Sequence, residues 1–100
     1  MVPVIVRPEA EDDIRQIHAY LEQARVGTGA KFIARLRHIL ERLESTPELF
    51  GIVWHDVRAV RVRRFQYVVY YVAFEDRVEV LAVMHGARDS TAWQSRARST

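Results

Sequence analysis

Residues 63–89 read RRFQYVVYYVAFEDRVEVLAVMHGARD, and this stretch decides the fold. Its positions 67–74 are apolar throughout, which is typical of a central strand covered on both faces. The polar residues 75–77 predict a tight turn, and residues 78–84 predict a last strand. Strands joined by so short a turn pair antiparallel. The last strand runs into the polar sequence His-Gly-x-Arg-Asp, and such a strand end is a common place for functional side chains.

The segment before this stretch has a period of two. From about residue 57, valines alternate with arginines, which predicts a strand with one buried and one charged face. Four arginines fall within seven residues there: Arg58, Arg61, Arg63 and Arg64. Like charges this close repel one another unless an anionic partner meets them. We therefore expect this cluster to bind an anionic group.

The N-terminal part predicts a strand followed by a helix. Residues 2–7 are mainly β-branched and predict the strand. Pro8 suits a first helical position, and the acids after it favour the positive end of a helix dipole. We expect this helix over residues 8–24, ending before Gly27. Its apolar stripe recurs at spacings of four, three and four residues: Ala10, Ile14, Ile17 and Leu21.

A second helix is predicted next; Pro47 either ends it or opens one more turn with Thr46 as its cap. Its apolar stripe consists of Phe32, Leu36, Ile39, Leu40 and Leu43. Its other side carries the basic residues Lys31, Arg35, His38 and Arg42. The connection between the two helices is only a few residues, so they are expected to pack as an antiparallel hairpin.

The order of elements is thus strand, two helices and three strands. Short connections give mainly antiparallel pairing, and the helix hairpin is expected to cover one face of the sheet. We predict an α+β fold of the type β-α-α-β-β-β, formed by residues 1–100 as a single domain. Residues from about 90 to 100 predict a short helix around Trp93 or a frayed tail.

The composition limits the function. Of 100 residues, 49% are hydrophobic and 28% are charged, which is ordinary for a soluble globular protein. There is no cysteine, and the four histidines show no metal-ligand spacing, so we expect no disulfide, metal or cofactor. The longest apolar run is far short of the ~20 residues of a membrane-spanning helix. The N-terminus lacks the features of a signal peptide, and we expect a cytoplasmic protein without membrane contact.

The sequence resembles the RelE/ParE superfamily of bacterial toxins over nearly the whole chain. The likeness includes the opening strand into RPEAEDDI, the helix with Ile17 and Tyr20, and the second helix before Pro47. Its most specific strings are RRFxYVVYY and LAVxHGxRD, with a tryptophan after the second. Each string alone is weak, whereas their order and spacing together are specific. They are most similar to the ParE side, often labelled plasmid stabilisation proteins.

The resemblance implies a toxin of a type II toxin–antitoxin module, with one of two activities. RelE-type members are ribosome-dependent endoribonucleases that use a basic cluster and usually a C-terminal tyrosine, whereas ParE-type members poison DNA gyrase. This chain keeps Arg88 where RelE-type members have an arginine. It has Tyr67 at the place of their second arginine and Trp93 near the place of their tyrosine, and its one lysine, Lys31, is on a helix. A gyrase inhibitor is therefore favoured, with an mRNA endoribonuclease or a non-toxic interaction module as alternatives.

The resemblance also implies a cognate antitoxin with a DNA-binding N-terminal part and a flexible C-terminal part, so that operator DNA is contacted only through the antitoxin. The expected antitoxin-binding residues lie on the helix stripes: Ile14, Ile17, Leu21, Leu36 and Leu40. The expected target-binding residues lie in and beside the sheet: Arg61, Arg63, Arg64, Tyr67, His85, Arg88 and Trp93. A nuclease would use four of the polar ones for phosphate binding and acid–base chemistry: Arg61, Arg64, His85 and Arg88.

Several of these residues also have structural interpretations. His85 could be hydrogen-bonded to the backbone at its strand end. Arg88 could form a salt bridge with Asp89. Trp93 could be a lid over the edge of the sheet rather than a contact to the target.

Overall fold

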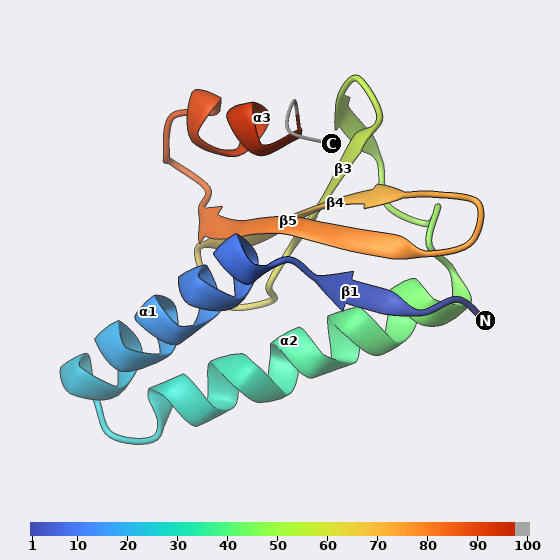
Figure 1. Cartoon of the computed structure of the whole chain (residues 1–100). Coiled ribbons are helices and arrows are strands. Elements are labelled where there is room, and N and C mark those ends of the chain that lie inside the picture. The colour runs from blue at the N-terminus through green and yellow to red at the C-terminus, as the bar shows by residue number, and fades with distance from the viewer. Residues whose placement is uncertain (98–100) are drawn as a thin grey trace.

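Two long helices lie against one face of a five-stranded sheet, and a short third helix lies over the other face (Figure 1). The computed structural model describes residues 1–97. Its elements are β1 (Val4–Val6), α1 (Pro8–Ala24), α2 (Thr28–Ser45), β2 (Ile52–Trp54), β3 (Val57–Arg61), β4 (Tyr67–Ala73), β5 (Val78–His85) and α3 (Thr91–Ala97). The sheet order is β1-β5-β4-β3-β2, with β1 parallel to β5 and the other pairs antiparallel. The predicted α+β fold, with a helix hairpin on a mainly antiparallel sheet, is confirmed.

The turn between α1 and α2 is fixed by glycine and one carboxylate. Gly27 has φ +92°, a left-handed conformation that L-residues with a Cβ rarely adopt. The Glu22 Oε1 atom accepts hydrogen bonds from the backbone N–H groups of Gly27 and Gly29, both at 2.9 Å. These bonds hold the pKa of Glu22 below its ordinary value. The carboxylate thus satisfies N–H groups at the start of α2 that have no partner within the helix.

The sheet separates two apolar clusters. On the side of α1 and α2, Ile17, Phe32 and Leu36 pack with Val69 and Tyr71 in the larger cluster. On the side of α3, a second cluster contains Val57, Tyr70, Val72, Leu81, Ala82, Met84 and Trp93. Strand β4 lies between β3 and β5 and contributes to both clusters. The expectation that residues 67–74 form a central strand covered on both faces is therefore confirmed for β4.

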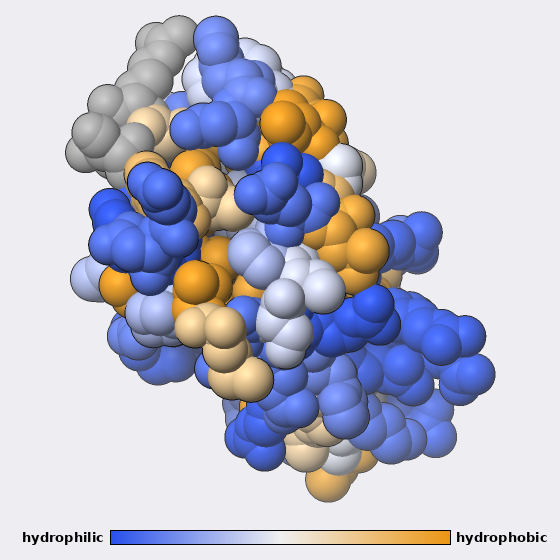
Figure 2. Space-filling model, turned by 90° about the vertical axis from the view of Figure 1, so that its right-hand side faces the viewer, coloured by the Kyte–Doolittle hydropathy of each residue, from blue (hydrophilic) through white to orange (hydrophobic). Residues whose placement is uncertain are grey.

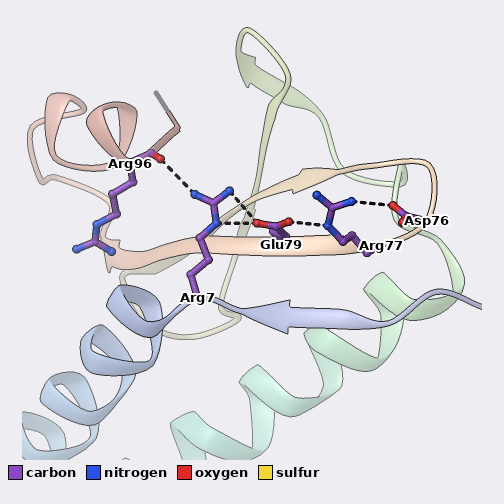
Figure 3. A network of polar contacts seen from close by, with 5 residues as sticks. All are labelled: Arg7, Asp76, Arg77, Glu79 and Arg96. Atoms are coloured by element: carbon purple, nitrogen blue, oxygen red, sulfur yellow. Dashed lines mark hydrogen bonds and ion pairs between the residues drawn. The ribbon is translucent and has the colours of Figure 1, made fainter. Parts of the chain in front are cut away.

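A chain of charged residues links the end of β1 to β5 and α3 (Figure 3). Arg7 donates from Nε to Glu79 Oε1 at 2.8 Å, and Arg77 donates from Nε to Glu79 Oε2 at 2.6 Å. Arg77 also pairs with Asp76 at 2.8 Å. A further guanidinium nitrogen of Arg7 lies 3.3 Å from the backbone oxygen of Arg96. Glu79 is thus held between two arginines, one on each side.

Two details differ from the sequence prediction, and a third agrees with it. The short edge strand β2 was not anticipated, because its Ile52 and Val53 are both exposed and show no alternation. The first strand is shorter than residues 2–7. The predicted C-terminal helix exists as α3, whereas the end of the predicted tail, residues 98–100, lies outside the described residues.

Candidate functional site

The four arginines near residue 60 have two different roles. Arg58 is tied to the segment after α2, because its Nη1 donates to the backbone oxygens of Glu48 at 3.2 Å and Phe50 at 2.7 Å. Arg61 braces the connection between β3 and β4, since its Nε donates to the Phe65 oxygen at 3.0 Å. The two arginines inside that connection, 63 and 64, are exposed. Arg58 is thus structural, and the other three form a cationic surface.

This connection lies beside α2, and the two enclose a groove. One open hollow of about 620 Å³ is lined by Lys31, Ala34, Arg35, His38, Arg64 and Phe65. A second hollow of about 290 Å³ shares Arg35 and His38 with the first and continues along the helix to Arg42. We call this continuous surface the basic groove and define it by Lys31, Arg35, His38, Arg42, Arg61, Arg63 and Arg64.

The charges of the basic groove are not neutralised within the described chain. The ion pairs found among residues 1–97 lie elsewhere and involve Arg7, Arg15, Arg77 and Arg96. Among the described residues that line these hollows and the adjoining one at the end of α2, the acidic side chain is Glu41. Six formal positive charges together with His38 therefore face solvent with little compensation, which favours an anionic partner.

The end of the sheet near His85 forms a second polar cluster. Tyr67 on β4 is paired with His85 on β5, and their rings lie 5.8 Å apart, edge to face. The His85 Nδ1 atom accepts a hydrogen bond from the Ala87 N–H at 3.0 Å. The tautomer that matches this bond carries its ring proton on Nε2, which can act as a donor toward solvent. The hydrogen-bonded strand-end histidine considered from the sequence is thus what the structure contains.

Burial raises the pKa of the Tyr67 phenol, and the nearby Tyr20 raises it further. The phenol therefore stays protonated at neutral pH. It can donate or accept a hydrogen bond but cannot take a proton as a phenolate.

Asp89 caps α3 rather than pairing with Arg88. Its Oδ1 accepts hydrogen bonds from Thr91 N–H at 2.9 Å and from the Thr91 hydroxyl at 2.7 Å. These bonds hold the pKa of Asp89 below its ordinary value. No Arg88–Asp89 salt bridge is present among the described residues, and Arg88 is exposed in the turn before the cap.

Trp93 is on the opposite face of the sheet from α1 and α2. Its ring stacks on Tyr70 with centroids 4.4 Å apart and an interplanar angle of 12°, and only 6% of the residue is exposed. This geometry agrees with a lid over the sheet. The structure therefore divides the predicted target-binding set: the arginines 61, 63 and 64 adjoin α2, the pair of Tyr67 and His85 ends the sheet, and Trp93 is buried under α3.

The predicted antitoxin-binding stripe faces the sheet. Ile17 and Leu36 are buried in the larger cluster. Ile14, Leu21 and Leu40 pack against that cluster and are partly exposed.

In Figure 2, hydrophilic residues dominate the lower part of the surface, over the helical layer, and apolar patches lie higher. The large exposed apolar residues are Tyr20 on α1 and, at the N-terminus, turns and sheet edges, Met1, Ile5, Val26, Leu49, Ile52 and Val53.

The basic side of α2 was not assigned to a site from the sequence. The signal was present, because Lys31, Arg35, His38 and Arg42 recur at spacings of four, three and four residues on one helix face. What the sequence lacked was the position of the β3–β4 connection beside that face.

Among residues 1–97, no cluster of three or more histidine, cysteine or acidic side chains could hold a metal ion. No helix in that range is both long and apolar enough to cross a membrane.

Two solved structures share this architecture. A chain of the chromosomal ParDE TA system from P. aeruginosa superimposes with a TM-score of 0.74 and 12% identity, over 85% of this chain and 96% of that chain. The YoeB dimer from Staphylococcus aureus gives a TM-score of 0.58 and 13% identity, over 81% of this chain and 92% of that chain. The fold is thus shared with a chain of a TA system and with the YoeB dimer structure. No curated protein matches the chain significantly by sequence.

Residues 4–90 match the family described as the ParE toxin of type II toxin-antitoxin system, parDE. The match covers most of the chain, from the first strand through the polar turn after β5. The chain therefore belongs to the ParE toxin family.

Proposed function

We propose that this ParE-family toxin arrests growth by inhibiting DNA gyrase, and that it does so by binding rather than by cutting RNA. Cleavage of RNA by a metal-free site needs a base to take the 2′-hydroxyl proton and an acid for the leaving oxygen. The main support for the proposal is the hydrogen bonding of His85. Its Nδ1 lone pair already accepts the Ala87 N–H, so this nitrogen is not available to take a proton as a base. Its neighbour Tyr67 has a raised pKa and supplies no base either.

We further propose that a cognate antitoxin neutralises the toxin in the cytoplasm. The similarity in fold to a chain of a ParDE system supports a partner of this kind. This antitoxin would have a DNA-binding N-terminal part and a flexible C-terminal part. Because Ile17 and Leu36 are buried, its apolar contacts on the helix hairpin would be made to Ile14, Leu21 and Leu40, which remain partly exposed.

A supercoiling assay with purified gyrase tests the target. The wild-type protein is expected to inhibit supercoiling, and the purified antitoxin is expected to restore it. His85→Gln should inhibit as well as the wild type, because it keeps a hydrogen-bonding side chain and removes the imidazole. Gyrase would be refuted as the target if purified gyrase supercoiled DNA normally at saturating toxin while induction of the same toxin still arrested cell growth.

Primer extension on translating ribosomes tests the ribonuclease alternative in parallel. We expect no toxin-dependent cuts in mRNA. Codon-specific cuts that vanish in His85→Ala or Arg88→Ala would assign the chain to the endoribonucleases. Normal growth on induction without the antitoxin would instead identify a non-toxic interaction module.

A further inference from the structure

We infer that the basic groove binds the phosphodiester backbone of a nucleic acid. The toxin would then contact nucleic acid directly, through α2 and the β3–β4 connection. This inference does not rest on the proposed target, because the groove would bind a phosphate backbone whether or not gyrase is inhibited.

The spacing of the cations along α2 suits a repeating anion. From Lys31 to Arg42 the groove follows eleven residues of helix, about 16 Å at 1.5 Å per residue. The intermediate positions 35 and 38 place a basic side chain on nearly every turn. One strand of duplex DNA carries a phosphate for about every 3.4 Å of axis, so the groove spans roughly five phosphates. A single small anion would leave most of these cations unmatched.

The opposite wall supplies the chemistry for phosphate recognition. Arg63 and Arg64 lie across from α2, and a guanidinium can bind phosphate through two parallel hydrogen bonds. Arg61 adds a positive charge to this wall, while its Nε and Nη2 donate to the Phe65 oxygen and Gln66 Oε1. Arg64 has φ +69°, an uncommon conformation for a residue with a Cβ. It lines the larger hollow together with Lys31 and Arg35. Cations on two walls would therefore enclose a backbone from both sides.

The floor of the groove favours a nucleic acid over an amphipathic protein segment. Phe65 lines the larger hollow, and its ring is held edge to face against Phe32 with centroids 5.4 Å apart. An aromatic ring within a basic groove is a site where a base can stack. An amphipathic helix, by contrast, needs exposed apolar surface. The groove has apolar lining at Ala34, Ile39 and Phe65, but none of the large exposed apolar residues among residues 1–97 lies in it.

Fluorescence anisotropy across a series of salt concentrations tests this inference with three labelled probes. These are duplex DNA, single-stranded RNA of equal length, and polyglutamate of equal charge. The test variant is Lys31→Gln/Arg35→Gln/Arg42→Gln, which removes three charges from the α2 wall. The control variant is Arg15→Gln/Arg25→Gln/Arg37→Gln, which removes the same charge from exposed positions outside the groove. Thermal melts establish that both variants fold.

The wild type is expected to bind a nucleic acid at least tenfold more tightly than polyglutamate at the same ionic strength. The test variant should reduce the magnitude of the slope of log K against log salt by about 2–3, since each lost phosphate contact contributes about 0.9 for duplex DNA and about 0.7 for a single strand. The control should change the slope by less than about 1. Comparison of the two nucleic acid probes shows whether the groove prefers the backbone of duplex DNA or of single-stranded RNA.

Three results would overturn the inference. The first is no binding of either nucleic acid at low salt. The second is polyglutamate binding as tight as nucleic acid binding, which would assign the groove to an acidic protein segment. The third is an equal loss in the test and control variants, because binding would then follow net charge rather than this groove. A gyrase assay on the test variant separates the two proposals, since nucleic acid binding can be lost there while inhibition is kept.

Discussion

The Asp13 carboxylate on α1 and the Arg96 guanidinium on α3 form a bidentate ion pair past the edge of the sheet, with N–O distances of 2.6 and 3.2 Å. Both side chains also bind the backbone of β5 where that strand has no neighbouring strand on this side. Asp13 accepts the Val83 N–H at 3.0 Å, and Arg96 donates to the Leu81 oxygen at 3.1 Å. Strand β1 pairs β5 only over residues 78–80, so these side chains replace a neighbouring strand where β1 ends.

We expect Asp13→Ala to lower the free energy of unfolding by about 2–4 kcal/mol, because it leaves a partly buried guanidinium and a strand N–H without their acceptor. Urea unfolding measures this loss. The control is Asp12→Ala, the adjacent residue, whose pair with Arg15 is exposed and contributes at most about 1 kcal/mol. Equal losses in both variants would show that Asp13 does not hold the strand edge.

Local signals in the sequence predict the elements, and distant pairing accounts for what they missed. Pro8 and Gly27 mark the limits of α1 by their own backbone chemistry, so a short window of sequence is enough. Asp13 and Arg96 are separated by 83 positions, and no period or spacing links them. The basic groove could not be predicted for the same reason, because only folding brings Arg64 beside Lys31. The side of a helix that faces solvent in the sequence pattern can still line a site in the fold.

Stability is expected to fall in acid through Glu79. Hydrogen bonds from Arg77 first, and also from Arg7, hold the pKa of Glu79 below its ordinary value of 4.5. Because the folded-state pKa is below the unfolded one, the ionised carboxylate stabilises the fold above about pH 4.5. That contribution is lost as the pH falls through the folded-state pKa.

Glu79→Gln should therefore be less stable than the wild type at pH 7, and the difference should shrink as the pH is lowered below 4.5. Chemical unfolding at several pH values measures it. The matched control is Glu75→Gln, because Glu75 is exposed in the turn before β5. This variant should have the same stability as the wild type at each pH. A difference between Glu79→Gln and wild type that stays constant with pH would refute this linkage.

The two helices approach each other closely at Gly29. A Cβ at this position would lie 2.9 Å from the His18 backbone oxygen and 2.7 Å from Glu22 Cγ. Alanine improves helix propensity by at most about 1 kcal/mol, whereas such overpacking costs about 1–3 kcal/mol. We expect Gly29→Ala to lower the melting temperature. Gly51→Ala is the control, because a Cβ there meets nothing within 4 Å, and it should change stability by less than about 0.5 kcal/mol.

Trp93 provides a test that separates a structural lid from a contact to the target. Its ring is almost fully buried and stacked on Tyr70, so Trp93→Ala should cost about 3–5 kcal/mol of unfolding free energy. Trp93→Phe keeps an aromatic ring over Tyr70 and should lose less than half as much stability. If Trp93 is a lid, Trp93→Phe will inhibit gyrase as strongly as the wild type wherever both are folded, as measured by supercoiling at matched concentrations. A folded Trp93→Phe variant that has lost inhibition would show instead that the indole itself contacts the target.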